Sequence, residues 1–422
     1  MRTILSVLLL TGVLQLSAQR ECSTQQYIES IKASTSAAKT IADAEIFLAQ
    51  SKKNKAVSKT MADDVVVRIP VVIHVLYNNA AQNVSDEQIK TQIEALNRDF
   101  RKRNSDTVNI PQRFKQFAAD VQIEFALATA DPKGRATSGV IRKQTGVKEW
   151  KMDDKIKFSA QGGDDAWDSK SYLNIWVGNM MGLLGYSSPV GGPAEKDGVV
   201  IAPSAFGTIN TSGSFNLGRT AVHEVGHWLG LKHLWGDTYC GDDSVDDTPK
   251  QGGFTSGCPN AFRSSSCDNS TLGDMYMNYM DFTNDGCINL FTHGQKARMR
   301  SLFGDGGPRV SLLYSKGLHK PWVEEAPLPE PVTGKDDPTT AVMQLKLYPN
   351  PVSGSEIVLD FDYDATWVGK EVSIVSMNGN AVQKIKITAK TQRISLASLK
   401  AGIYFIQGWN EGKKLQQKFV RL

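Results

Sequence analysis

Apolar and polar positions in the first three quarters of the chain form patterns that predict strands mixed with helices. Residues 65–77 are dominated by β-branched side chains and predict a strand, in which His74 is interpreted as a packed histidine. In residues 85–104, apolar side chains recur at helical spacing behind Ser85 and Gln88, which predict a capping box. Further strands are predicted at 121–130, 172–177 and 198–203.

A second helix is predicted at residues 216–232, and a long region without an apolar period follows it. Residues 235–289 are rich in Gly, Ser, Asp and Cys. Loops of this length are uncommon in compact domains, but four cysteines can hold this one together. Helical periodicity returns at residues 295–302.

The last quarter of the chain has a different pattern. Residues 320–340 hold five prolines and show no helix or strand period, which predicts a linker. Residues 341–422 consist of short alternating runs separated by turns, and Asn378-Gly379 is a strong hairpin signal. We therefore expect an α+β fold, with a mixed twisted sheet and helices followed by a small all-β sandwich.

The first sixty residues predict that the protein is exported and that these residues are later removed from it. Residues 1–18 have a positive start, an apolar run and a small-residue end, as a signal peptide does. Residues 19–60 are polar, with a helical stretch at 24–49 and the basic patch KKNK at 52–55. We interpret them as a removable pro-segment with a protease-accessible end; the alternative is an ordinary N-terminal helix. The apolar run is too short to span a membrane, and no lipid anchor is predicted at Cys22.

Composition and charge narrow the class of protein. Of 422 residues, 41% are hydrophobic and 22% are charged, which is typical of a soluble globular protein. The net charge of +4 is small, so no nucleic-acid partner is expected. Four of the five cysteines predict two disulfides in any of three connectivities, and Cys22 is left over. The four are Cys240, Cys258, Cys267 and Cys287.

Residues 223–233 read HEVGHWLGLKH and carry the strongest chemical signal in the chain. His223 and His227 lie one helical turn apart, and Gly230 can take a positive φ so that His233 returns as a third ligand. Three neutral imidazoles with an open fourth position are typical of catalytic zinc. Glu224 is expected to take a proton from zinc-bound water and pass it to a leaving amine. A surface helix with scattered histidines is the alternative, but three of only six histidines fall on these positions.

The eleven-residue motif resembles the metzincin zinc-protease signature at every specified position. MNYMDF at 277–282 is similar to the methionine turn of that family, with Met280 as the turn methionine. The stretches YLNIWV, LLGYSSP, DDTP and FTHGQKARM make the resemblance closest to bacterial pappalysins, over roughly residues 65–305. It implies a metzincin-like zinc protease of two subdomains, an upper twisted sheet and a lower loop-rich part, with a cleft between them.

The resemblance has three further implications. The disulfides would be Cys240–Cys267 and Cys258–Cys287. Pappalysins bind calcium in the loops after the zinc helix, and Asp243, Asp247 and Thr248 are the candidate ligands here; an ordinary solvated acidic loop is the alternative. Cys22 would keep the precursor latent by placing its thiolate on the zinc, unless it is a thiol that is simply lost with the pro-segment.

One position departs from the family pattern. Relatives commonly carry a tyrosine two residues after the turn methionine, where its hydroxyl can stabilise the oxyanion, and this chain has Phe282. Zinc alone would then polarise the carbonyl, or Tyr279 or another residue would substitute, or turnover would be slower. Some relatives cleave before Arg or Lys, which needs an acidic residue at the base of the pocket. Asp281 and Asp285 are the nearby candidates.

The tail resembles the C-terminal sorting domain of the type IX secretion system. The shared features are LYPNP, the MNGN hairpin, AGIYFI and a lysine-containing last strand. The resemblance implies an all-β cargo domain that the secretion machinery recognises. An Ig-like binding module that stays attached is the alternative.

The whole sequence predicts a secreted, latent zinc endopeptidase that cleaves proteins or peptides, extracellular or at the cell surface, as a monomer without a transmembrane anchor. The expected parts are a signal peptide (1–18), a pro-segment (19–60), a catalytic domain (61–319), a linker (320–340) and a sorting domain (341–422). Two alternatives are another zinc hydrolase, such as an amidase or deformylase, and an inactive protease-like binding or adhesion protein. Phe282 is the one residue that favours the latter.

Overall fold

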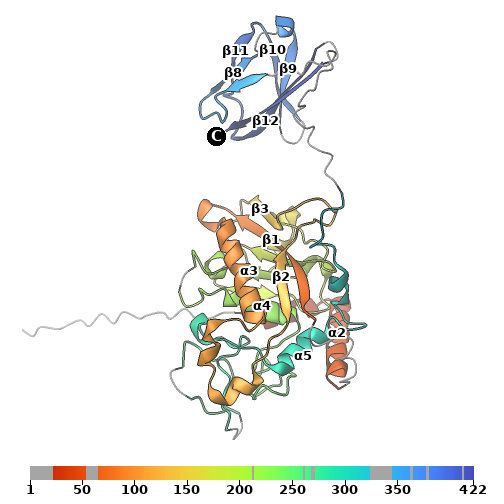
Figure 1. Cartoon of the computed structure of the whole chain (residues 1–422), viewed down its shortest axis with the longest axis vertical. Coiled ribbons are helices and arrows are strands. Elements are labelled where there is room, and N and C mark those ends of the chain that lie inside the picture. Colours follow the sequence, from red (N-terminus) through yellow and green to blue (C-terminus); the bar gives the residue numbers. More distant parts are fainter. Residues whose placement is uncertain are drawn as a thin grey trace, which may run out of the picture. The chain divides into compact units, whose positions relative to one another are not determined.

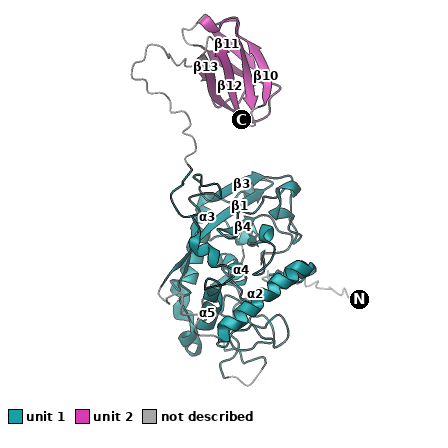
Figure 2. Cartoon of the chain, turned by 90° about the vertical axis from the view of Figure 1, so that its right-hand side faces the viewer, with its two compact units in different colours: residues 1–325 teal, residues 326–422 magenta. Residues whose placement is uncertain are grey.

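The computed structural model describes residues 22–53, 65–211, 213–259, 262–267, 271–323, 345–361, 365–376, 380–410 and 413–422. The chain divides into two compact units, one up to residue 325 and one from residue 326 onward (Figure 2). The predicted signal peptide, most of the predicted linker and the Asn378-Gly379 turn lie outside the described residues. Among the helices that are described, none has the length and apolar character needed to cross a bilayer.

The first unit is built on a mixed sheet in which β1, β2, β4 and β6 were predicted from the sequence, while β3 and β5 were not. Its path is β2-β1-β4-β6-β5, and β3 pairs with the second half of β1. The strands are β1 (Val67–Tyr77), β2 (Ile123–Leu127), β3 (Val140–Gln144), β4 (Leu173–Val177), β5 (Gly185–Ser187) and β6 (Val199–Ile201). All pairings are parallel except that of β5 with β6. β5 ends this path, and an edge strand offers backbone groups to which another segment can add.

His74, inside β1, is a packed histidine as expected. Its ring is fully buried, with Nδ1 2.7 Å from Asp164 Oδ2 and Nε2 3.1 Å from Asn174 Oδ1. The ring also stacks on Trp176, with the centroids 5.1 Å apart. Because both ring nitrogens have partners, His74 has a structural role in the sheet.

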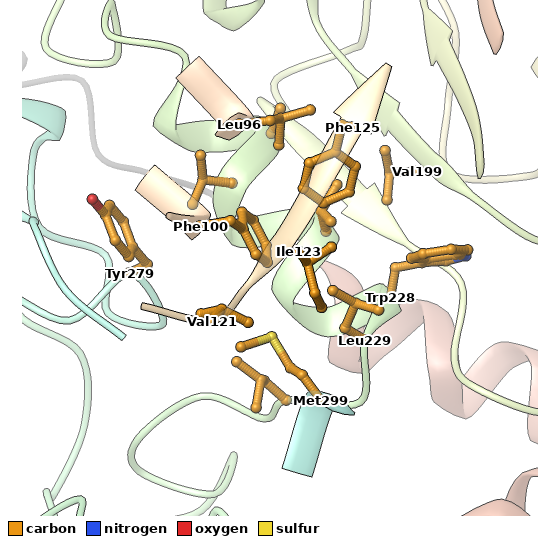
Figure 3. Packing of buried hydrophobic residues seen from close by; sticks show 14 of the residues in the cluster. Leu96, Phe100, Val121, Ile123, Phe125, Val199, Trp228, Leu229, Tyr279 and Met299 are labelled. Atoms are coloured by element: carbon orange, nitrogen blue, oxygen red, sulfur yellow. The ribbon is translucent and has the colours of Figure 1, made fainter. Parts of the chain in front are cut away.

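Three helices of the first unit are α3 (Asp86–Phe100), α4 (Arg219–Trp228) and α5 (His293–Ser301) (Figure 1). The main core contains Leu96 and Phe100 of α3, Phe125 of β2 and Met299 of α5 (Figure 3). These side chains come from elements far apart in the sequence. Val225 and Trp228 of α4 belong to the same core, so this burial fixes α4, which carries the first six residues of the HEVGHWLGLKH motif, against the sheet.

The start of α3 corrects one prediction. Ser85 is the N-cap, and its side chain accepts a hydrogen bond from the backbone N–H of Gln88, as the motif predicts. The Gln88 side chain does not complete the capping box, because its amide donates to the carbonyls of Pro203 and Phe206. Tertiary hydrogen bonds of the Gln88 side chain therefore replace its expected bond within the capping box.

Two predicted helices have different bounds in the structure. The segment predicted at 216–232 is helical only from Arg219 to Trp228, since Gly218 before it has φ +74° and Gly230 after it has φ +82°. The stretch predicted at 24–49 consists of α1 (Thr24–Lys32) and α2 (Thr35–Lys53). α2 packs against α5, so the candidate pro-segment lies on the first unit (Figures 1 and 2).

The second unit is all-β, as predicted. Its described strands form two antiparallel sheets, of order β10-β9-β12-β13 and β11-β8-β7. The strands are β7 (Lys346–Tyr348), β8 (Glu356–Asp360), β9 (Glu371–Ser376), β10 (Ala381–Lys386), β11 (Thr391–Ser395), β12 (Gly402–Asn410) and β13 (Lys413–Arg421). Residues of both sheets, such as Ile357, Leu359, Ile374 and Phe419, share a core of their own.

Candidate active site

Helix α4 and the turn behind it bring three imidazole nitrogens together. His223 and His227 lie one turn apart on α4, and the chain reverses at Gly230 to present His233. Nε2 of His227 lies 3.1 Å from Nε2 of His223 and 3.1 Å from Nε2 of His233. All three side chains are buried. The structure thus unites the three histidines that the motif singled out.

The second nitrogen of each ring fixes its tautomer. Nδ1 of His223 lies 2.7 Å from the Tyr279 carbonyl, and Nδ1 of His227 lies 2.9 Å from the Leu231 carbonyl. Carbonyl oxygens only accept hydrogen bonds, so these Nδ1 atoms carry the protons and the Nε2 atoms offer lone pairs. Burial, together with His233, lowers the pKa of His227 to about 3, which keeps its ring neutral.

His233 is oriented by a carboxylate, since its Nδ1 is hydrogen-bonded to Asp237 Oδ1. Three Nε2 lone pairs directed at one another cannot donate hydrogen bonds to each other, and a shared cation would satisfy all three. Three imidazoles whose other nitrogens are held by carbonyls or a carboxylate are the usual surroundings of a zinc ligand set. The residues present therefore fit zinc.

The methionine turn packs directly on α4. Met280 is fully buried, and a Cβ added at Gly226 would lie only 2.6 Å from its Sδ. The carbonyl of Tyr279, in the same turn, accepts the hydrogen bond of His223. The turn therefore supports the helix and orients the first histidine, and glycine at 226 allows the close approach.

Glu224 is buried beside the histidines and is in contact with the N-terminal segment. Thr24 Oγ1 donates to Glu224 Oε2 at 2.9 Å, and the same hydroxyl accepts from the backbone N–H of Ser187 at 3.0 Å. Cys22 Sγ lies 3.6 Å from the same carboxylate oxygen. The expected general base is thus engaged by residues of the candidate pro-segment.

Cys22 joins the three histidines in one group of candidate ligands. Its Sγ and one nitrogen from each ring all lie within 4.8 Å of one another, and all four residues are buried. The backbone of Cys22 forms a parallel bridge with Gly185 of β5. The segment therefore adds to the edge of the sheet and brings its thiol to the histidines.

Phe282 lines the site and offers no hydroxyl. Its ring centroid lies 4.9 Å from that of His233 and 5.0 Å from that of Trp235. The suggestion that Tyr279 supplies the missing hydroxyl is wrong. Tyr279 is fully buried in the main core (Figure 3). Its ring lies 4.7 Å from that of Phe291.

Asp281 and Asp285, the candidates for the base of a specificity pocket, accept hydrogen bonds from backbone N–H groups instead. Asp281 is fully buried and accepts from Thr255 N at 2.6 Å, and burial raises its pKa to about 6. Asp285 is also buried and accepts from Leu217 N at 2.8 Å and from Arg219 N at 3.2 Å. These bonds give both side chains a structural role in the loops around α4.

Two disulfides join segments of the long loop region. They are Cys240–Cys267 and Cys258–Cys287, the pairing that the family resemblance implies. The second links the loop to the region just after the methionine turn. Such crosslinks restrict the unfolded chain and make a long loop compatible with a compact fold.

The candidate calcium ligands fall in two places. Thr248 Oγ1 donates to Asp243 Oδ2 at 2.8 Å, and burial raises the pKa of Asp243 to about 6. Asp247 instead accepts from Thr292 Oγ1 at 2.6 Å and from Gly294 N at 2.8 Å, at the start of α5. Asp243 and Thr248 therefore contact each other, while Asp247 accepts hydrogen bonds at the N-terminus of α5.

Sequence reasoning missed two residues of the site, Asp237 and Thr24, and one contact residue outside it, Tyr27. Asp237, which orients His233, stands four residues behind it, and an acidic residue so close to a ligand was a readable signal. Thr24 and Tyr27 contact the catalytic part from the N-terminal segment. Only the folded chain brings them there, because they are distant in sequence from their partners.

Two family models match separate parts of the chain. A peptidase family described as Pregnancy-associated plasma protein-A matches residues 158–304, which include the three histidines and Met280. A secretion system C-terminal sorting domain matches residues 346–421.

Curated relatives are described as extracellular metalloproteases. One from Arthroderma benhamiae is 33% identical over 242 residues, which are 55% of this chain and 76% of the relative. One from Pyricularia oryzae is 45% identical over 129 residues, which are 29% of this chain and 44% of the relative. The chain thus spans less than half of the second relative and most of the first.

Two solved structures from Tannerella forsythia are similar to this chain. A promirolysin mutant is 42% identical, with a TM-score of 0.63, and the match covers 70% of this chain and 97% of that one. Mature mirolysin in complex with a cleaved peptide is 46% identical, with a TM-score of 0.58, over 59% of this chain and 96% of that one. The precursor form matches the larger share of this chain.

Proposed function

Because this chain belongs to the pappalysin (pregnancy-associated plasma protein-A) family of metalloproteases, we propose that it is a secreted zinc endopeptidase made as a latent precursor. The observation that carries the proposal is the convergence of three buried imidazole nitrogens beside the Glu224 carboxylate. A buried set of this kind matches the needs of a catalytic metal and a general base.

His223, His227 and His233 would hold the zinc ion, and their Nδ1 partners orient the rings. When bound there, zinc supplies a Lewis acid that polarises a peptide carbonyl and lowers the pKa of water. Glu224 is the proton carrier: its carboxylate accepts a proton from the attacking water and donates it to the leaving amine. Phe282 and Trp235, whose ring centroids lie 5.0 Å apart, would limit water beside the histidines.

Latency is proposed to depend on two residues of the pro-segment. Cys22 would occupy the ligand position that water needs, since its Sγ belongs to the same group as the three ring nitrogens. Thr24 would keep Glu224 from acting as a base, because its hydroxyl already donates to that carboxylate. Cleavage behind residue 53 would release both.

Two further proposals concern the rest of the chain. The second unit would direct the protein, as a monomer, to the type IX secretion machinery, because it matches a sorting domain. Asp243 and Thr248 are proposed as calcium ligands. A melting temperature that calcium does not change would contradict the latter.

The proposal is tested on the full-length precursor after brief trypsin treatment, with the trypsin then inhibited. We expect a single zinc ion per chain and casein cleavage that a zinc chelator abolishes and added zinc restores. Cleavage that continues at full rate in the metal-free protein would contradict the proposal.

One observation favours a second candidate, a protease-like binding protein with little or no activity. Phe282 stands beside His233 where a hydroxyl donor is common in relatives, and Tyr279 does not replace it. If the zinc-loaded, activated protein leaves casein intact, this candidate is favoured. Casein cleavage by Phe282→Tyr alone would then identify the missing hydroxyl as the cause.

A further inference from the structure

The candidate pro-segment is held by a second buried contact away from the histidines. Tyr27 of α1 is only 1% exposed, although it belongs to a segment whose release we propose. Its ring lies 4.7 Å from that of Tyr186, which stands in β5 between Gly185 and Ser187. Those two neighbours contact Cys22 and Thr24, so all three contacts follow one short strand.

The Tyr27 hydroxyl is bound by a carboxylate and an ammonium group together. It donates to Asp154 Oδ1 at 2.6 Å and accepts from Lys157 Nζ at 2.9 Å. Lys157 is fully buried; its Nζ also donates to the Lys196 carbonyl at 2.8 Å and lies 3.1 Å from Asp154 Oδ1. The phenol therefore supplies one of three partners to a buried ammonium, a group that is costly to leave unpaired.

Aromatic rings complete the enclosure. Lys157 Nζ lies 4.7 Å from the centroid of the Tyr27 ring, 4.9 Å from that of Tyr186 and 5.4 Å from that of Trp176. Such cation–π contacts favour an aromatic ring beside the ammonium. Phenylalanine would fill the space but could bond neither Asp154 nor Lys157. The socket therefore fits a phenol and not a plain phenyl ring.

We propose that Asp154, Lys157, Trp176 and Tyr186 form a phenol-binding socket that anchors the pro-segment through Tyr27 and maintains latency independently of Cys22. The effect on latency rests on the proposed function, because only a protease can be latent. The socket itself is defined by contacts outside the histidine group. By fixing Tyr27 beside Tyr186, the socket sets the register in which Cys22 and Thr24 meet β5.

Hydrogen exchange on the full-length precursor tests the anchor without using activity. Tyr27→Phe removes only the hydroxyl and alters the pro-segment rather than the socket, so the catalytic part keeps its fold. We expect the amides of α1 to exchange roughly tenfold faster, because a hydrogen bond to charged groups is lost. The matched control is Tyr314→Phe, since Tyr314 is 78% exposed. Unchanged exchange of α1 in Tyr27→Phe would overturn the proposal.

The rate of casein cleavage before trypsin treatment distinguishes the contribution of Tyr27 to latency from that of Cys22. We expect Cys22→Ser to stay less active than the trypsin-treated protein, and the double variant Cys22→Ser/Tyr27→Phe to cleave at least tenfold faster than Cys22→Ser alone. If Cys22→Ser alone cleaves as fast as the trypsin-treated protein, the anchor proposal is wrong. If even trypsin-treated wild type fails to cleave, the proposed function fails, and hydrogen exchange still decides on the socket.

Discussion

At the scale of single residues, the proposed metal site depends on partners that stand behind the three histidines. Asp237 contacts Nδ1 of His233 and fixes which ring nitrogen faces the other two histidines. We predict that Asp237→Ala raises the dissociation constant of zinc by roughly 10–100-fold, as loss of such outer partners does. Competition with a chromogenic chelator measures it.

The control for this prediction is Asp305→Ala, which removes an exposed carboxylate of the same unit. It should leave zinc affinity unchanged. Equal zinc affinity in Asp237→Ala and wild type would mean that His233 is oriented by other contacts.

Thr24 is the second residue whose substitution has a specific expected effect. Its hydroxyl donates to Glu224 and accepts from Ser187, and valine keeps the shape while losing both bonds. We predict that the Thr24→Val precursor cleaves casein roughly tenfold faster than wild type before trypsin treatment, because a bond to a carboxylate is lost. Thr24→Ser, which keeps a hydroxyl, should remain as latent as wild type. A Thr24→Val precursor with wild-type latency would remove Thr24 from the inhibitory mechanism.

Some residues of the site could be predicted from the sequence, and others could not. His223, Glu224 and His227 were predictable because helical spacing alone places them together. Thr24 and Tyr27 were not, because their partners stand more than a hundred residues away and only the folded chain brings them together. The Tyr279 suggestion failed for a related reason: sequence proximity to Met280 does not say which way a ring points.

At the scale of elements, α4 and the methionine turn act as one support. We predict that Gly226→Ala lowers stability by about 1–3 kcal/mol, because the new methyl group overpacks against the Met280 sulfur. This cost exceeds the gain that alanine usually brings in a helix. Thermal unfolding of both proteins measures the difference.

Gly146→Ala is the matched control, since Gly146 is exposed and an added Cβ would meet no atom within 4 Å. It should leave the melting temperature nearly unchanged. A Gly226→Ala protein as stable as wild type would show that the turn can move away from α4 without cost.

Element boundaries were less predictable than the elements themselves. The apolar period predicted a helix at 216–232, but backbone geometry at Gly218 and Gly230 limits α4 to ten residues. Gly230 was expected to take a positive φ, and it does. The strands at 65–77 and 172–177 appeared within two residues of their predicted bounds, because both are buried and rich in β-branched or aromatic side chains.

At the scale of the whole molecule, the two units have separate cores. We predict that removing residues 326–422 leaves the melting temperature and the casein cleavage of the activated first unit unchanged. The truncated protein should accumulate inside a cell that exports the full chain through type IX secretion. Normal export of the truncated protein would contradict a sorting role for the second unit.

The central claim is that Glu224 performs proton transfer at a metal held by the three histidines. The most direct test is the casein cleavage rate of Glu224→Gln against wild type, both activated by trypsin and both assayed for zinc. We predict equal zinc content and a rate lower by roughly 10²–10⁴-fold, because glutamine keeps the shape but cannot accept the proton. A Glu224→Gln protein that binds zinc and cleaves casein at the wild-type rate would contradict the account.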